Sequence, residues 1–382
     1  MTKQLNLYRI FLLFLFIMSI HPWFLWGMAT QYITVIGALY SIILLTKGKI
    51  LCLEKRMASS IIAFFFLYIW MAKYFNVFGY IESIANWIIL VGIIALKEQY
   101  KISLFQFITK WFSLLLLVSL LFYFFYIVGV ALPHTSMTAG LYDTSISNYY
   151  AFVVIDGSYR FQSIFREPGY LTMGVAPLLF LNKYDFKNKY VLIMFIAQLF
   201  SFSLAGYLIM VVGYIFIVVF SNITNKIRRI TIPLLVFSGF MYATIEIFGE
   251  NLFQDLILSR LELENGMISG NNRSSDYLDF RFEQTLKSSD IFFTGSEYNR
   301  DLSEKGVAGF KLYFVMYGLF GIIILCWAYL KTFFSSTNTR TNISYGFLVI
   351  IFLLLYQNAY PTMWAVLIAL ITTPVVLGAC RK

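Results

Sequence analysis

Long apolar runs without a single charge set the narrowest limit on what this chain can fold into. The run from Leu114 to Pro133 holds twenty residues and no Asp, Glu, Lys or Arg. At 1.5 Å per residue, a helix of this length crosses a hydrocarbon core about 30 Å thick. Only 13% of the 382 residues are charged, against roughly 25% in soluble domains. We therefore expect an all-α polytopic membrane protein, with residues 1–382 forming one integral membrane domain.

Hydropathy divides the chain into about twelve predicted transmembrane helices. Their approximate ranges are 8–27, 30–46, 57–72, 79–96, 110–132, 167–182, 190–203, 205–221, 230–248, 308–330, 343–356 and 361–379. The pair at 190–203 and 205–221 has an alternative, which is one long kinked helix.

The distribution of basic residues decides between these alternatives. With a cytoplasmic N-terminus, the short cytoplasmic segments hold nineteen of the 29 Lys and Arg residues, which is the excess typical of cytoplasmic loops. A single helix over 190–220 would place Lys226, Arg228 and Arg229 outside, so we predict a hairpin that turns at Ser201–Gly206. We expect a multi-pass protein of the cell inner membrane with both termini in the cytoplasm. The net charge of +10 then reflects topology, and no nucleic-acid partner is expected.

Two segments lie between predicted helices on the periplasmic side. Residues 133–166 form the first periplasmic loop, which is polar and rich in Ser, Tyr and Asp. Residues 249–307 form a large periplasmic loop between the ninth and tenth helices, and they hold eleven of the 19 acidic residues. A loop of this length with its own helices usually has a function or closes a site.

Two helices are predicted inside the large loop. Leu252–Leu263 has an amphipathic pattern. Asp276–Leu286 follows Ser274 and Ser275, either of which suits an N-cap. Acidic residues in the first turn of this helix would complement its dipole.

The segment before the sixth predicted helix is the most informative for function. Pro168 suits the first turn of a helix, so the helix should begin near Glu167 at the periplasmic face. Arg160 and Arg166 lie just before it. A helix N-terminus with two arginines can bind a phosphate or diphosphate, and Glu167, which shares a helix face with Tyr170, can take a proton from a hydroxyl. In the alternative interpretation, Arg166 and Glu167 form interfacial ion pairs or reach the lipid headgroups.

A second group of basic residues lies in the large loop. Arg273 and Arg281 bracket the second predicted loop helix and Arg300 follows it, so we predict that they bind substrate. The alternative is an ordinary solvated helix surface.

Several chemistries are disfavoured. The chain has two histidines, His21 and His134, far apart in sequence, which disfavours a histidine zinc site or a histidine-centred triad. It contains no Asp-x-Asp and no GxxxxGK[ST] motif. We expect no metal and no cofactor.

Arg160 followed by the run Phe165-Arg-Glu-Pro-Gly-Tyr170 resembles the Wzy-type O-antigen polymerases, within the O-antigen ligase and polymerase superfamily. The layout is similar over nearly the whole chain. Further likenesses are the hairpin at Ser201–Gly206, Gly295 near the end of the large loop, and Gly306 before Tyr-Gly-Leu-Phe-Gly at 317–321. Two features depart from the family pattern. Thr294-Gly-Ser296 replaces a frequent Gly-x-Gly, and neither Arg273 nor Arg281 has the expected tryptophan nearby.

The resemblance implies a GT-C-like glycosyltransferase that joins undecaprenyl-diphosphate-linked oligosaccharide repeat units into O-antigen polysaccharide. Arg160 and Arg166 would bind the diphosphate and Glu167 would act as base. The residues implied in substrate binding are Tyr170, Arg273, Arg281 and Arg300. Partners implied are the lipid bilayer, the lipid-linked glycans, and a chain-length regulator and flippase of the same pathway.

Two other functions stay open. A lipid-linked oligosaccharide flippase or other transporter would tend to show repeated halves, and the chain shows no internal repeat. An O-antigen ligase is similar in layout, but that family generally depends on a histidine in the large loop. Residues 249–307 contain none, which favours a polymerase.

Overall fold

A computed structural model gives the architecture of most of the chain. It describes residues 2–26, 31–47, 55–73, 77–139, 144–156, 158–220, 275–296, 309–333 and 363–379. It also describes short strands at 263–264 and 267–268 and single positions at 231, 235, 238, 239, 242, 246 and 346.

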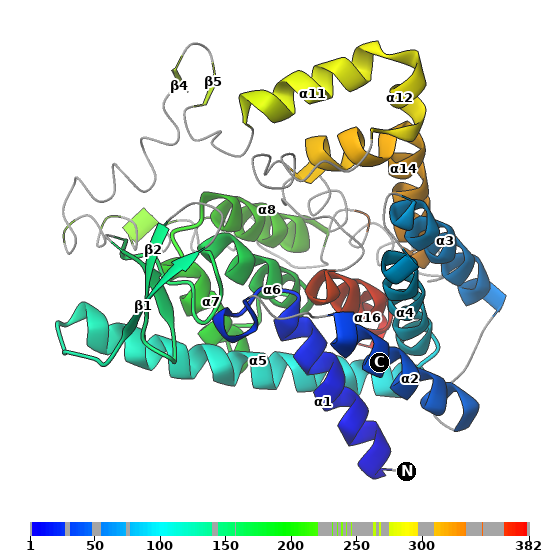
Figure 1. Cartoon of the computed structure of the whole chain (residues 1–382). Coiled ribbons are helices and arrows are strands. Elements are labelled where there is room, and N and C mark those ends of the chain that lie inside the picture. The colour runs from blue at the N-terminus through cyan, green and yellow to red at the C-terminus, as the bar shows by residue number, and fades with distance from the viewer. Residues whose placement is uncertain are drawn as a thin grey trace.

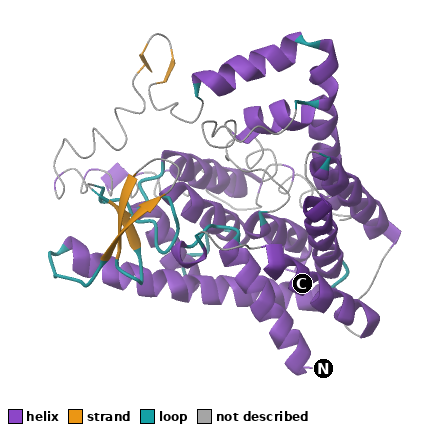
Figure 2. Cartoon of the chain, viewed as in Figure 1, coloured by secondary structure: helices purple, strands orange, loops and turns teal. Residues whose placement is uncertain are grey.

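The described residues are mostly helical, as Figure 2 shows. The helices are α1 (Thr2–Met18), η1 (Trp23–Leu25), α2 (Gln31–Lys47), α3 (Lys55–Ala72), α4 (Val77–Ile94), α5 (Glu98–Ile127), α6 (Pro168–Leu181), α7 (Lys189–Phe200), α8 (Leu204–Phe220), α11 (Asp276–Lys287), α12 (Ser289–Thr294), α14 (Gly309–Phe333) and α16 (Trp364–Ala379). By length and composition, α4, α5 and α14 can cross a membrane, and several shorter helices are also apolar. This architecture is compatible with an all-α membrane protein.

A small antiparallel sheet lies within the predicted first loop. Its strands are β1 (Thr135–Ala139), β2 (Thr144–Asn148) and β3 (Val153–Ile155), in the order β1-β2-β3. Ile146 and Val153 are buried and contact partly buried Trp23. The sheet therefore rests on the segment after α1, a contact that hydropathy does not predict. A second pair, β4 (Leu263–Glu264) and β5 (Met267–Ile268), is antiparallel.

Helix α6 lies near the centre of the structure (Figure 1). It packs on α7, α8 and α16, and all its residues except Gly169 and Tyr170 are buried. A helix that is apolar on every side belongs inside a bundle. α6 thus forms a fixed central element whose N-terminus faces the segment that precedes it.

Several predicted boundaries agree with the structure. α6 begins at Pro168 with Glu167 as its N-cap. α7 and α8 are separate helices, so residues 190–220 do not form one helix. In the large loop, α11 begins after Ser275, whose hydroxyl accepts a hydrogen bond from the Leu278 N–H at 3.2 Å.

Other predicted boundaries differ. α1 ends at Met18, whereas the predicted helix extends to residue 27, so His21 lies outside it. α5 begins at Glu98 and not near residue 110, because polar residues such as Glu98 and Lys101 lower the hydropathy of its first turns. Most of the predicted helices at 230–248, 252–263 and 343–356 lies outside the described residues, and Leu263, the last residue of the second, belongs to strand β4.

Helix α14 is interrupted at Gly318, whose φ of 65° and ψ of −169° are not helical. The interruption frees backbone carbonyls, and donors from elsewhere in the chain satisfy them. The Ser296 N–H donates to the Val315 carbonyl at 2.8 Å, and the Trp70 indole N–H donates to the Tyr317 carbonyl at 3.1 Å. The end of α12 and helix α3 therefore both contact α14 at its break.

Candidate functional site

The N-terminus of α6 lacks a side-chain cap. Glu167 is its N-cap with extended backbone angles, and its side chain makes no capping hydrogen bond. Pro168 occupies the first turn, where a missing N–H costs nothing. Since the positive end of the helix dipole is not neutralised by a capping side chain, it can stabilise an incoming anion.

The segment between Arg160 and Glu167 is held by hydrogen bonds on one side to the α7–α8 turn. The Phe161 N–H donates to the Phe200 carbonyl at 2.8 Å, and the Arg160 Nε donates to the Ser201 carbonyl at 3.3 Å. The Tyr123 hydroxyl of α5 donates to the Tyr159 carbonyl. The direction of the Arg160 side chain is therefore set by the backbone of the turn.

The same segment is bound to the sheet, to α5 and to the chain after α1. The Ser163 carbonyl accepts from the Val153 N–H at 2.8 Å, and the Ser163 and Ser119 hydroxyls are 2.8 Å apart. The Trp23 N–H donates to the Ile164 carbonyl at 2.9 Å. Four parts of the fold therefore converge on these few residues, which fixes the backbone in front of α6.

Arg166 has an unsatisfied guanidinium group. The residue is half-buried, and its Nη2 atom is buried with no hydrogen-bond partner. A buried donor without a partner carries a desolvation cost of about 1–3 kcal/mol, more for a charged group, and such groups are rare in native proteins. An anion at the N-terminus of α6 would satisfy this donor.

His21 belongs to this site, although the sequence analysis assigned it no role. The Arg166 N–H donates to the His21 carbonyl at 3.2 Å, and the Trp26 indole N–H donates to the same carbonyl at 3.1 Å. The residue as a whole is exposed, but its imidazole packs edge-on against the Tyr170 ring, with centroids 4.9 Å apart, and the ring is partly desolvated. Desolvation, and secondly the positive charge of Arg166, lower the pKa of His21 below its ordinary value.

Strained backbone gathers around the same place. His21, Tyr150, Ser163 and Phe202 all have positive φ, between 44° and 65°. Non-glycine residues in this region cost of the order of 1 kcal/mol each and cluster at functional sites. Ser163 lies in the segment before α6, Phe202 follows the partner of Arg160, and the Tyr150 carbonyl accepts from the Trp23 indole at 3.2 Å.

A buried polar layer lies behind the segment. Gln198 of α7 donates through Nε2 to the Thr172 hydroxyl at 3.1 Å and to the Ser201 hydroxyl at 3.2 Å. Gln162 is only 1% exposed, yet neither atom of its amide group has a hydrogen-bond partner. The polar character of this part of the bundle interior extends beyond the two arginines.

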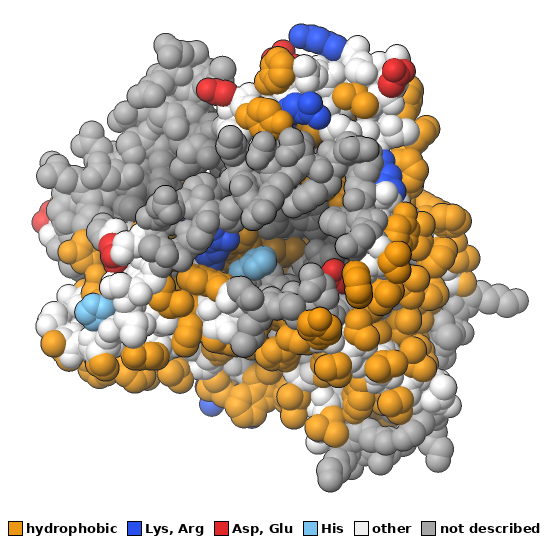
Figure 3. Space-filling model, viewed as in Figure 1, with side chains coloured by type: hydrophobic (Ala, Val, Ile, Leu, Met, Phe, Trp, Pro, Cys, Tyr) orange, Lys and Arg blue, Asp and Glu red, His pale blue; other side chains and the backbone are white. Residues whose placement is uncertain are grey.

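The space-filling view shows a hollow on the face that carries the sheet and the α11 helix (Figure 3). Lys or Arg atoms and a histidine are visible inside it, next to hydrophobic side chains. The combination of a recess, a cation and an apolar wall suits an anionic headgroup with a hydrophobic tail.

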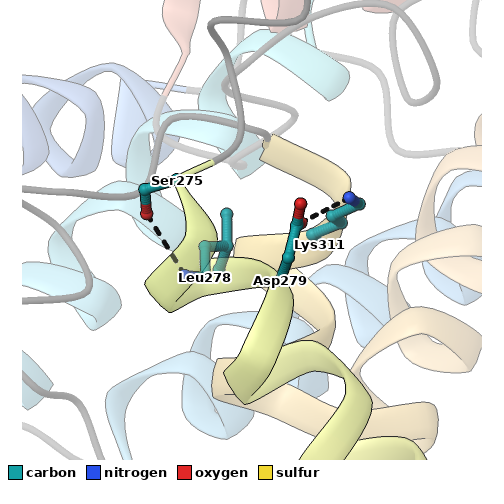
Figure 4. A network of polar contacts seen from close by, with 4 residues as sticks. All are labelled: Ser275, Leu278, Asp279 and Lys311. Carbon is teal, nitrogen blue, oxygen red and sulfur yellow. Dashed lines mark hydrogen bonds and ion pairs between the residues drawn. The ribbon is translucent and has the colours of Figure 1, made fainter. Parts of the chain in front are cut away.

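The loop arginines are not brought together with Arg166 by the described residues. Arg281 lies on α11, which packs on α14 and appears far from α6 in Figure 1. Figure 4 shows α11 fixed by its Ser275 cap and by the Asp279 carboxylate, which is 2.5 Å from the Lys311 Nζ. The Arg281 Nε atom is buried without a partner. Arg273 and Arg300 lie outside the described residues, so the substrate-binding role of all three stays a prediction.

Among the described residues, no group of three His, Cys, Asp or Glu side chains is placed to hold a metal ion. The groups that the structure places at the N-terminus of α6 are cationic side chains with a neighbouring carboxylate and imidazole.

Comparisons of the chain with protein-family models, with curated proteins and with solved structures find no match.

Proposed function

We propose that the chain is a polymerase that joins undecaprenyl-diphosphate-linked oligosaccharide repeat units into O-antigen polysaccharide at the periplasmic face of the inner membrane. The observation that carries this proposal is the buried, unpartnered Nη2 of Arg166 at the uncapped N-terminus of α6. A diphosphate supplies the acceptor oxygens that this arrangement lacks. The recess with an apolar wall supports a ligand that is both anionic and lipidic.

The reaction is a transfer of the growing glycan from its lipid to a new repeat unit. A hydroxyl oxygen of the acceptor bonds to the anomeric carbon of the donor, and the bond from that carbon to the diphosphate oxygen breaks. The lipid diphosphate leaves with the electron pair, and Arg166, Arg160 and the α6 dipole stabilise its charge. The hydroxyl proton passes to a base, for which the sequence predicts Glu167.

In the same proposal, further residues enclose the substrate. Tyr170, in the first turn of α6, would contact the sugars or the lipid. The large loop with Arg273, Arg281 and Arg300 would close over the site and limit hydrolysis. A chain-length regulator and a flippase of the same pathway are the expected protein partners.

The test is elongation by the purified protein in detergent, with a synthetic lipid-linked repeat unit as substrate and product length read on a gel. A flippase moves substrate across a bilayer and cannot lengthen it in detergent. A ligase would transfer a glycan to a different acceptor and give no ladder of repeat units. A ladder from the wild-type protein would therefore support the polymerase.

The matching variants are Arg166→Ala and Arg166→Lys. Loss of one charge-stabilising donor typically costs 10²–10³ in rate, so we expect Arg166→Ala to reduce elongation at least a hundredfold and Arg166→Lys to retain a trace. The control is Arg9→Ala, because the Arg9 Nε is also buried without a partner but lies on α1. Unchanged chain length in Arg166→Ala would remove Arg166 from the site.

A further inference from the structure

We propose that His21, rather than Glu167, is the general base that accepts the proton of the attacking hydroxyl; this inference rests on the proposed glycan transfer. His21 follows α1, and nothing in the pattern around it indicates a functional role. The structure brings it to the N-terminus of α6, where it contacts Arg166, which lies 145 positions further along the chain.

The backbone of His21 lies in the left-handed region, where tertiary contacts hold it. Its φ is 55°, which only glycine, asparagine, aspartate and histidine adopt with some ease. Its carbonyl receives two donors, the Arg166 N–H at 3.2 Å and the Trp26 indole at 3.1 Å. Next to it, Pro22 pairs with Phe165 in an antiparallel bridge. These contacts hold the His21 imidazole beside the Tyr170 ring, close enough to Arg166 for the charge of its guanidinium group to act on the imidazole.

Electrostatics favours an imidazole over a carboxylate in this position. The reaction requires a base within a site that also binds a diphosphate. A carboxylate beside a diphosphate adds like-charge repulsion, and in a partly desolvated site this repulsion is larger than in water. A neutral imidazole adds none. Imidazole is also the side chain whose ordinary pKa lies nearest to neutral pH, where general-base catalysis is most effective.

The charges around His21 change during the reaction in a favourable direction. Arg166 and the Tyr170 phenol are the titratable groups that the described residues place against it, and Glu167 follows Arg166 in the chain. In the free protein, desolvation and the Arg166 charge lower the pKa of His21, so the ring is neutral and ready to accept. A bound diphosphate neutralises Arg166 and thereby raises the proton affinity of the ring.

Bond formation, proton transfer and departure of the leaving group together conserve atoms and charge. The hydroxyl oxygen forms the new glycosidic bond while its proton moves to the unprotonated imidazole nitrogen. The lipid diphosphate leaves with the electrons of the broken bond. The imidazolium then returns its proton to solvent or to the departing diphosphate, which restores the neutral ring.

The experiment compares elongation by wild type, His21→Gly and Glu167→Gln across pH, with purified protein in detergent. Glycine accepts the positive φ and leaves a space that added imidazole can enter. We expect His21→Gly to lower kcat by about 10²–10⁴-fold with little change in KM, and imidazole to restore part of it. Binding of undecaprenyl diphosphate to the variant, measured by tryptophan fluorescence, should stay within threefold of wild type.

The pH profile distinguishes a general base from a residue with a merely structural role. For wild type, kcat/KM reports the free protein and should decrease as the pH falls, with a midpoint below about 6.5. The midpoint for kcat, which reports the complex, should lie at a higher pH because the bound anion raises the pKa of His21. Both acidic limbs should vanish in His21→Gly. The control His134→Gln, which changes the other histidine, should keep them, since His134 packs near β1 against Tyr149.

The two failures are distinguishable. If wild type elongates and His21→Gly keeps its rate, or loses it without imidazole rescue and with the acidic limb intact, His21 is not the base. If instead Glu167→Gln removes the limb, the carboxylate has that role. If wild type binds undecaprenyl diphosphate but produces no longer chain, the proposed function and the inference both fall.

Discussion

Two glutamines in the same buried layer differ in their hydrogen bonding. The Gln198 Nε2 donates to Thr172 and Ser201 while its Oε1 has no partner, whereas both amide atoms of Gln162 are buried without a partner. A buried polar atom without a partner costs about 1–3 kcal/mol. The buried amide of Gln162 therefore destabilises the fold, and Gln162 lies between Arg160 and Arg166. Destabilising residues of this kind are common at functional sites.

We expect Gln162→Met to raise the thermal unfolding midpoint in detergent, since methionine has a similar shape and removes the unpartnered amide. Gln198→Met should give a lower midpoint than Gln162→Met, because it removes two hydrogen bonds worth about 1 kcal/mol each together with one unpartnered oxygen. A lower midpoint for Gln162→Met would mean that its amide is satisfied in solution.

The pKa of Lys73 reports on the contact between the end of α3 and the large loop. Its Nζ donates to the Thr294 carbonyl and lies 4.3 Å from the centre of the Trp70 ring. Burial lowers the pKa of Lys73 to about 8. Since only the neutral amine reacts with acylating reagents, its reaction rate should be half-maximal near pH 8, as followed by mass spectrometry of the labelled peptide. A midpoint near the ordinary lysine value of about 10.4 would contradict the burial of this group.

At the residue scale, the sequence indicates part of the candidate site, whose residues stay a prediction. Arg160, Arg166 and Glu167 were predicted because Pro168 and the helix-start rules act over a few residues. His21 was missed because its contact with Arg166 and Tyr170 is tertiary and leaves no periodic signal. The strained φ of His21 is likewise a property of packing and not of the local sequence.

At the scale of elements, the break in α14 is matched by a second glycine. A side chain on Gly295 would place its Cβ 2.3 Å from the Met316 carbonyl oxygen, and one on Gly318 would approach the Gly295 nitrogen at 2.5 Å. Both residues also have positive φ. The two backbones can therefore meet only because neither residue has a side chain.

Gly295→Ala should lower the free energy of unfolding by roughly 2–4 kcal/mol, from the strained φ and from the steric conflict together. Gly169→Ala is a matched control in α6, since nothing lies within 4 Å of its added Cβ. We expect that variant to be neutral or slightly stabilising. Chemical denaturation of the detergent-solubilised protein measures both, and equal stability of the two variants would contradict the close approach.

Elements with a local signal were predicted well. The Ser275 cap, the Pro168 start and the separation of α7 from α8 follow from caps, proline and loop charge. The sheet β1–β3 was not predicted, because its short polar strands are stabilised by Trp23 and by the segment before α6. The twelve-helix count stays a prediction, since three described helices meet both the length and the hydropathy needed to cross a membrane.

At the scale of the whole molecule, the length of α6 limits the depth of the site. Its 14 residues extend about 21 Å, which is less than a hydrocarbon core of about 30 Å. If the turn after α6 lies at the cytoplasmic surface, the N-terminus of α6 lies below the opposite surface. That depth suits a diphosphate whose lipid stays in the bilayer.

The topology can be tested with single cysteines in a background that lacks Cys52, Cys326 and Cys380. Tyr159→Cys lies just before Arg160, and Lys187→Cys lies in the turn between α6 and α7; both positions are exposed. A membrane-impermeant maleimide added to cells with a permeabilised outer membrane should label the first and spare the second. Labelling of Lys187→Cys alone would place the site in the cytoplasm and exclude the proposed reaction.

The hydrogen bond from the Arg166 N–H to the His21 carbonyl has a consequence for biogenesis. The two residues leave the ribosome 145 codons apart, an interval on the order of ten seconds. Until then the His21 carbonyl can accept from the Trp26 indole but lacks the Arg166 N–H donor. A nascent chain arrested before Arg166 should therefore expose the loop after the first helix to proteolysis, and protection should begin only once the sixth helix has been inserted.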